Sequence, residues 1–282
     1  MAVMSANHSI RSPYVAGQFY PAGKEELSRQ IDGYLSAGDT DRQSNSLIRA
    51  LIVPHAGYVY SGAVAGRGFS LLKENSSRYK RIFIIGANHN ERARGFRFSV
   101  LKENYHATPL GKVKISDLSR QLVEKYPDMF QHQQLAYQSH IVEVQLPFLQ
   151  KVLEEDSFEI VPIISGEVSV KDLFFLSAML QEYSDDETLI IITADLSHYH
   201  PYKTAVELDA SCTDAIIALD KEKLLKNETC GLPVIWSLLD MAKHRGWKAE
   251  LIEYKNSGDT VGASGKDAVV GYASLAFWET VK

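Results

Sequence analysis

Short runs of apolar residues recur along the chain and alternate with amphipathic stretches. The runs are almost continuously apolar, as in "RIFIIGA" and "LIIITA". Such continuity is typical of strands that are buried on both faces of a sheet. The pattern predicts strands at residues 47–55, 79–89, 158–165 and 187–194, shorter half-exposed strands at 96–101 and 111–115, and closing strands at 248–257 and 268–278.

Between these strands the apolar positions recur with a helical period. We expect helices at residues 61–74, 116–126, 139–155 and 170–183, and helical stretches within 202–244. Ser61 and Ser116 are candidate N-caps, and Pro147 should kink its helix or mark the first turn. Alternating strands and helices predict a layered α/β/α fold with a largely parallel central sheet. The polar stretch 36–46 comes too early to divide two domains, so we expect one domain over residues 1–282.

Composition and charge narrow the possible partners. The chain has 282 residues, of which 45% are hydrophobic and 23% charged, and its formal net charge is -5. This composition is typical of a globular protein, and no basic run suggests nucleic-acid binding. The longest apolar runs are too short to cross a bilayer, and the N-terminus lacks the apolar core of a signal peptide. We therefore expect a cytoplasmic protein without nucleic-acid or membrane partners.

Histidines follow three of the predicted strands. The first strand ends in "PHAG" with His55, the second in "GANHN" with His89, and a third in "ADLSHYH" with Asp195, His198 and His200. In parallel sheets, ligands bind outside the carboxyl ends of the strands. One histidine after a strand is more often a hydrogen-bonded loop residue than a ligand. Three strands that deliver imidazoles to one edge favour a metal site, because imidazole is a common ligand of zinc, copper and iron.

The residues themselves leave a third ligand open. Asp195 would complete a site of two histidines and one carboxylate, the pattern of non-haem iron. Cys230, in "NETCGLPVIW", is the other candidate. Its position before a helix should lower the thiol pKa and favour the thiolate, and the alternative is a buried apolar role. Cys212 lies in a helical pattern and is expected to be a core residue, so a disulfide framework is not indicated.

Two further stretches carry candidate pocket residues. His140 and Glu143, in "SHIVEVQLPFL", are three residues apart and share a face of the predicted helix. They are candidates to orient the histidines or a substrate, and the alternative is a solvated first turn. Tyr58 and Tyr60, in "PHAGYVYSG", can supply phenol groups or simply pack.

Six motifs together resemble the Memo family, including the Memo-like component of the microbial AmmeMemoRadiSam system. They occur in family order over nearly the whole chain and read "GQFYPAG", "IVPHAGYVYSG", "RIFIIGANHN", "HIVEVQLPFLQ", "ITADLSHY" and "CGLPVI". The resemblance implies a fold similar to that of class III extradiol dioxygenases, which hold non-haem iron. It also implies possible partner proteins, including a radical SAM protein.

The resemblance further implies roles for particular residues. Two histidines and a cysteine form the metal site in Memo proteins, and they correspond here to His55, His89 and Cys230. Asp195 and His198 would line the same pocket, with His198 as acid–base catalyst by similarity to the dioxygenases.

The chain departs from the family pattern at two positions. Asn90 and Gln145 stand where the family often has a further histidine, so no role is carried over to them.

Two functions are compatible with these observations. The first is an iron- or copper-dependent oxidoreductase acting on an unknown small substrate, with a zinc-dependent hydrolase as a variant. The second is a binding module that holds a peptide or small ligand in the same pocket without catalysis.

Overall fold

The structure is a computed structural model, and it describes residues 9–36, 46–260 and 265–280. The predicted linker at 36–46 lies almost entirely outside these residues. The helices are α1 (Lys24–Ser36), α2 (Tyr58–Ser70), α3 (Leu118–Lys125), α4 (Leu146–Val152), α5 (Val170–Tyr183), α6 (Tyr202–Ile217), α7 (Lys221–Leu224), α8 (Leu232–Arg245) and α9 (Ser257–Thr260), with short 3-10 helices η1 (Lys73–Asn75), η2 (Gln134–Tyr137) and η3 (Glu143–Gln145).

The strands join in one mixed sheet. They are β1 (Ile10–Arg11), β2 (Ser46–Val53), β3 (Arg81–Ala87), β4 (Phe98–Val100), β5 (Tyr105–Thr108), β6 (Gly111–Ile115), β7 (Phe130–Gln131), β8 (Glu159–Ser165), β9 (Thr188–Thr193), β10 (His198–His200), β11 (Lys248–Asn256) and β12 (Val269–Thr280). Along the sheet the order is β1-β5-β6-β8-β3-β9-β2-β12-β10. The centre, from β6 to β2, is parallel, while β12 runs antiparallel to β2, β10 and β11.

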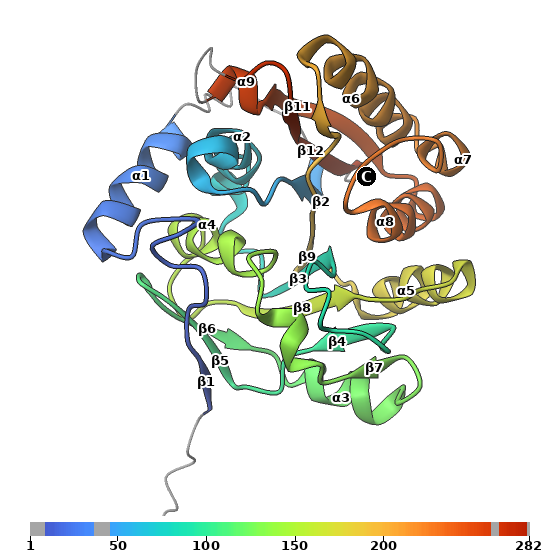
Figure 1. Cartoon of the computed structure of the whole chain (residues 1–282). Coiled ribbons are helices and arrows are strands. Elements are labelled where there is room, and N and C mark those ends of the chain that lie inside the picture. Colours follow the sequence, from blue (N-terminus) through green and yellow to red (C-terminus); the bar gives the residue numbers. More distant parts are fainter. Residues whose placement is uncertain (1–8, 37–45, 261–264, 281–282) are drawn as a thin grey trace, which may run out of the picture.

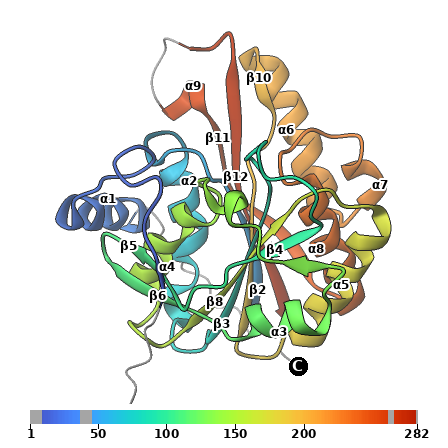
Figure 2. The same ribbon diagram turned by 60° about the horizontal axis from the view of Figure 1, so that its bottom comes forward.

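Helices cover both faces of this sheet. Figure 2 shows α1, α2 and α4 on one side and α5, α6 and α8 on the other. Successive strand residues point to opposite faces. Ile84 and Ile191 accordingly pack into one core, and Phe83 and Ile190 into the other. Two apolar cores that sandwich a mainly parallel sheet confirm the predicted α/β/α layers (Figure 1).

Two predicted helices differ from the structure in ways that affect the site. The helix predicted at 61–74 already begins at Tyr58, and the Ser61 hydroxyl donates to Ala56 O instead of capping it. The helix predicted at 139–155 is shorter. Its first residues form a loop and η3, and α4 begins only at Leu146 with Pro147 in its first turn, where the missing N–H has no intrahelical partner to lose.

The helical region predicted at 202–244 divides into α6, α7 and α8. The loop between α7 and α8 carries Cys230 back to the sheet edge. Among the described residues, none of the helices combines the length and apolar character that crossing a membrane requires.

Candidate metal centre

His55 lies directly beyond β2 with its ring almost completely buried. The carboxyl ends of β2 and β9 are neighbours, because Val53 pairs with Thr193. This register places the Thr193 hydroxyl 2.9 Å from His55 Nδ1. The pKa of His55 is well below its usual range, mainly because the ring is buried, so the ring is neutral at pH 7.

The hydrogen bonds of Thr193 determine which His55 nitrogen carries the proton. Gln145 Nε2 donates to Thr193 Oγ1 at 2.9 Å, and the hydroxyl itself donates to Ile141 O at 3.3 Å. A threonine hydroxyl has one proton and two lone pairs, so its remaining lone pair accepts from His55 Nδ1–H. His55 Nε2 is then unprotonated, which is the form that binds a metal.

His89 reaches the same point from the loop after β3. Its Nδ1 lies 2.9 Å from Ala87 O, and a carbonyl oxygen can only accept, so Nδ1 carries the proton. This leaves Nε2 of a second imidazole with a free lone pair. The His89 and His55 rings are perpendicular, with centroids 5.0 Å apart.

His140 is the third member of the cluster. Its segment packs closely on β3 at Gly86, where a Cβ atom would lie 2.2 Å from Ile141 Cγ2. Burial, and then the neighbouring His55 and His89, lowers the pKa of His140 to about 3. One ring nitrogen from each of the three histidines lies within 4.8 Å of the other two, an arrangement that can hold a metal ion.

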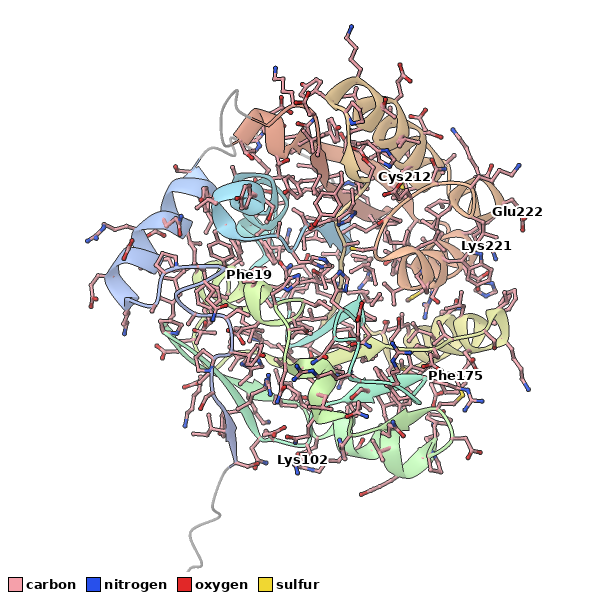
Figure 3. All side chains as sticks on the ribbon, viewed as in Figure 1. Phe19, Lys102, Phe175, Cys212, Lys221 and Glu222 are labelled. Atoms are coloured by element: carbon pink, nitrogen blue, oxygen red, sulfur yellow. The ribbon has the colours of Figure 1, made fainter. Side chains whose placement is uncertain are left out.

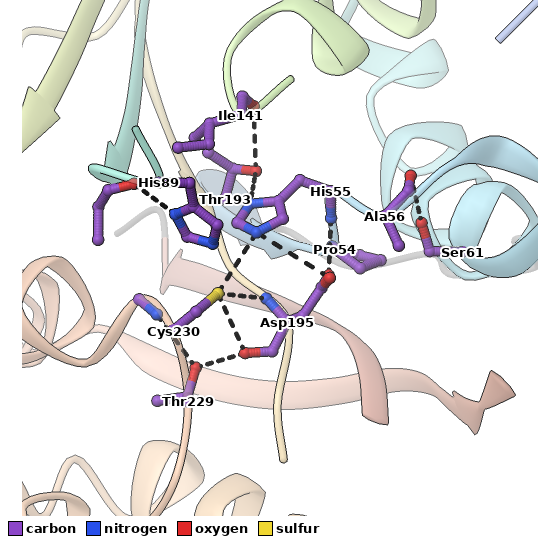
Figure 4. A network of polar contacts seen from close by, with 12 residues as sticks. Pro54, His55, Ala56, Ser61, His89, Ile141, Thr193, Asp195, Thr229 and Cys230 are labelled. Carbon is purple, nitrogen blue, oxygen red and sulfur yellow. Dashed lines mark hydrogen bonds and ion pairs between the residues drawn. The ribbon is translucent and has the colours of Figure 1, made fainter. Parts of the chain in front are cut away.

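Cys230 is adjacent to this cluster (Figure 4). Its Sγ lies 3.3 Å from His55 Nε2 and accepts a hydrogen bond from Asp195 N at 3.1 Å. Burial, and to a smaller extent Asp195, raises the pKa of the Cys230 thiol. This is opposite to the lowered pKa that we predicted from its position before α8. The desolvation of the thiolate outweighs the backbone hydrogen bonds that favour the thiolate. A bound cation would change this balance, because a thiol that coordinates a metal loses its proton.

Asp195 lies in the loop after β9, and His198 is the first residue of β10. Asp195 Oδ1 accepts from His55 N at 2.8 Å, and its Oδ2 is 4.0 Å from His55 Nε2. Burial raises the pKa of Asp195, although the hydrogen bond from the His55 amide opposes this. The His198 amide donates to Glu228 Oε1 at 2.9 Å, and its imidazole belongs to the wall of the adjoining cavity.

Two cavities meet at this centre. The first encloses about 550 Å³ and is lined by Phe19, His55, Ala56, Gly57, Tyr60, His89, His140, Asp195, His198, Tyr199, Ser257, Ala268, Val270 and Tyr272. The second encloses about 560 Å³, and its wall includes Cys230 and Ser165. His89 lines both cavities, so the centre is approached from two sides.

Tyr58 and Glu143, which the sequence placed in the pocket, are not among the residues that line these cavities. Tyr58 is buried, and its hydroxyl donates to Val144 O at 2.7 Å. Glu143 is buried as well and binds the N-terminal segment, so it does not share an exposed helix face with His140. Tyr60 lines the first cavity instead, as expected for residues two apart on a helix, which point in different directions.

Sequence reasoning also missed two features of the centre. His140 was considered for the pocket but not for the ligand cluster. Phe19 lies in the motif "GQFYPAG", but nothing in the local pattern indicates that this residue contacts a histidine more than a hundred positions away.

Comparisons with known proteins show which proteins this chain is similar to. The family model described as "Memo-like protein" matches residues 11–276. A MEMO1 family protein of Saccharolobus solfataricus is 33% identical over 286 residues, covering 95% of this chain and 99% of that protein. A MEMO1 family protein of Ignicoccus hospitalis is 35% identical, with 95% and 98% covered. A solved structure of an uncharacterized Escherichia coli K12 protein aligns with a TM-score of 0.49 at 12% identity, covering 80% of this chain and 99% of that one.

Proposed function

The chain belongs to the Memo-like protein family, and from that premise we propose that it is a metal-dependent oxidoreductase of a small substrate. The observation that carries this proposal is the cluster of His55, His89 and His140, whose ligand atoms lie within 4.8 Å of one another. Three imidazoles that converge on one point form a usual protein contribution to an open metal site.

The chemistry of the donors fits a divalent cation. His55 and His89 each hold a proton on Nδ1 through a hydrogen bond to the protein, which leaves Nε2 available. The lowered pKa values of His55 and His140 keep both rings neutral at pH 7, so no proton competes with the metal. Cys230 supplies a soft donor next to the three nitrogens, and this set suits iron and copper.

A bound iron or copper ion would supply electron transfer and an open coordination position. The surrounding residues would bind the substrate and move protons. Asp195 fixes the His55 loop through its hydrogen bond to the His55 amide. His198, in the wall of the cavity, is the group that we assign to proton transfer with the substrate.

A zinc hydrolase is the second candidate. Three neutral imidazoles are also a donor set of catalytic zinc, which activates a water molecule. The cavity and the role of His198 would be the same, but the protein would be colourless and redox-inactive.

Metal analysis of the purified protein tests the proposal. We expect about one equivalent of iron or copper, and loss of most of it in His55→Ala, His89→Ala and His140→Ala. His132→Ala is the matched control, because the His132 ring bonds to Val100 O away from the centre. Stoichiometric zinc without iron or copper would favour the hydrolase. A wild-type protein that neither retains nor binds a divalent metal would contradict both and leave a ligand-binding module.

A further inference from the structure

An N-terminal arm, defined here as residues 14–20, runs from β1 past α4 towards α1 (Figure 1). The buried Glu143 anchors this arm. Its Oε2 accepts from Tyr14 N at 2.7 Å, and its Oε1 accepts from Val15 N at 2.9 Å and from the Tyr20 hydroxyl at 2.7 Å. Glu143 is only 1% exposed, and a buried carboxylate is unfavourable unless donors compensate it. All three of these donors belong to the arm, so the arm and the carboxylate stabilise each other.

The arm carries Phe19 to the metal centre. Figure 3 shows Phe19 towards the middle of the molecule. Its ring stacks on His140, with centroids 4.3 Å apart and an interplanar angle of 14°. Its carbonyl accepts from Tyr58 N at 2.8 Å, at the start of α2 and three residues after His55. The two segments are in ordinary van der Waals contact there, since a Cβ on Gly57 would lie 3.6 Å from Phe19 O. The arm therefore contacts the segments of two of the three histidines.

His140 differs from the other two histidines in how its ring is held. A metal-binding histidine usually donates its second N–H to a protein acceptor, which fixes the ring. His55 has Thr193 for this purpose and His89 has Ala87 O. Among the described residues, the His140 ring has no protein acceptor of this kind, and the parallel stack with Phe19 is its closest ring contact.

We propose that Phe19 and Glu143 are positioning residues of the metal centre. Phe19 sets the plane of the His140 imidazole, and Glu143 holds Phe19 in place through the arm. The ligand concerned is the divalent metal ion, so this inference rests on the proposed function. It assigns a role at the centre to the arm, which supplies none of the clustered histidines.

Substitution of Phe19 tests the stacking. Phe19→Leu keeps an apolar side chain but removes the flat ring. We expect Co²⁺, titrated by its visible absorption, to bind about 10–100-fold more weakly, the usual cost of losing a residue that orients a ligand. Phe19→Tyr should restore binding to within a few-fold. In a His140→Ala background Phe19→Leu should cause no further loss, because the ring that it positions is gone.

Substitution of Glu143 tests the anchor. In Glu143→Gln the backbone N–H groups of Tyr14 and Val15 lose a charged acceptor. Their hydrogen exchange should accelerate, and Co²⁺ affinity should fall as in Phe19→Leu. Glu159→Gln is the control, because Glu159 bonds to Ser116 and Lys114 outside the arm.

Tyr20→Phe removes a single donor to Glu143 and should shift exchange and affinity in the same direction by less. It serves as the test if Glu143→Gln does not fold. Faster exchange with unchanged Co²⁺ affinity would overturn the role of Glu143.

The outcomes separate this inference from the proposed function. A wild-type protein that binds no Co²⁺ would contradict the metal centre itself. A wild-type protein that binds Co²⁺, with Phe19→Leu binding equally well or losing as much affinity without His140 as with it, would overturn only the positioning role.

Discussion

Replacing Thr193 by valine would change the proton arrangement of the centre while nearly preserving side-chain shape. The Thr193 hydroxyl accepts from His55 Nδ1 and from Gln145 Nε2, both at 2.9 Å, and donates to Ile141 O at 3.3 Å. Valine removes all three interactions in a residue that is fully buried. Water cannot easily replace the missing hydroxyl, since the methyl group occupies its position.

The expected magnitude follows from the groups left without a partner. A buried donor that loses its acceptor costs about 1–3 kcal/mol, and two donors are affected here. His55 can avoid its share by moving the proton to Nε2, which faces Cys230 Sγ at 3.3 Å. The free energy of unfolding should therefore fall by about 1–3 kcal/mol rather than twice that. The nitrogen that would bind the metal, His55 Nε2, is then protonated, so metal affinity should fall by about 10–100-fold.

Urea unfolding and Co²⁺ titration measure the two effects separately. Thr193→Ser retains the hydroxyl and should retain affinity. Thr188→Val is the matched control, since Thr188 is a buried threonine on the same strand whose hydroxyl donates to Asp185 Oδ1 at 2.7 Å. It should lose stability without losing affinity. Thr193→Val protein that binds Co²⁺ as tightly as the wild type would refute the tautomer assigned to His55.

Three further predictions concern single side chains. His198→Ala should keep metal affinity within a few-fold, and loss as complete as in His55→Ala, measured by metal titration, would make His198 a ligand. Burial lowers the pKa of His106 to about 3. Between about pH 6.5 and 3 the His106 ring therefore takes up a proton only in the unfolded state, so the free energy of unfolding decreases as the pH is lowered. The stability advantage of wild type over His106→Gln should shrink by about 2 kcal/mol between pH 7 and 5 in urea titrations, and a constant difference would contradict the pKa. Burial raises the thiol pKa of Cys230, and that of Cys212 to about 12, so in metal-free protein at pH 7 both should react with a thiol reagent far more slowly than free cysteine; rapid labelling of Cys230 would count against this.

The sequence predicted the sheet well because its strands are defined by local pattern. The continuous apolar runs gave β3, β8 and β9 to within a few residues, and the parallel arrangement followed from the alternation with helices. It also brought His55, His89 and Asp195 to one sheet edge, since the rule for strand ends needs only chain order and strand direction.

The parts that could not be predicted depend on contacts between distant segments. Glu143 was predicted to lie in the pocket, with a solvated first turn of a helix as the alternative, but the arm covers it and supplies its donors. His140 joined the cluster because its segment forms a loop against Gly86 rather than the first turn of a helix. The predicted direction of the Cys230 pKa shift was wrong because burial, which no local pattern reports, raises this pKa.

The wide spacing of the site residues along the chain affects the order of folding. Cys230 and His55 are in contact although they are 175 residues apart in the sequence, and His55 and Asp195 are 140 residues apart. Contacts of such high sequence separation form late, after the loop-closure entropy of the parallel strands has been overcome. An unfolded chain thus offers a metal ion no preformed site, in contrast to a zinc finger, whose close-spaced ligands let the metal drive folding. Metal loading must follow folding, and the exposed side of His89, which borders both cavities, is the point of the cluster that an incoming ion can reach first.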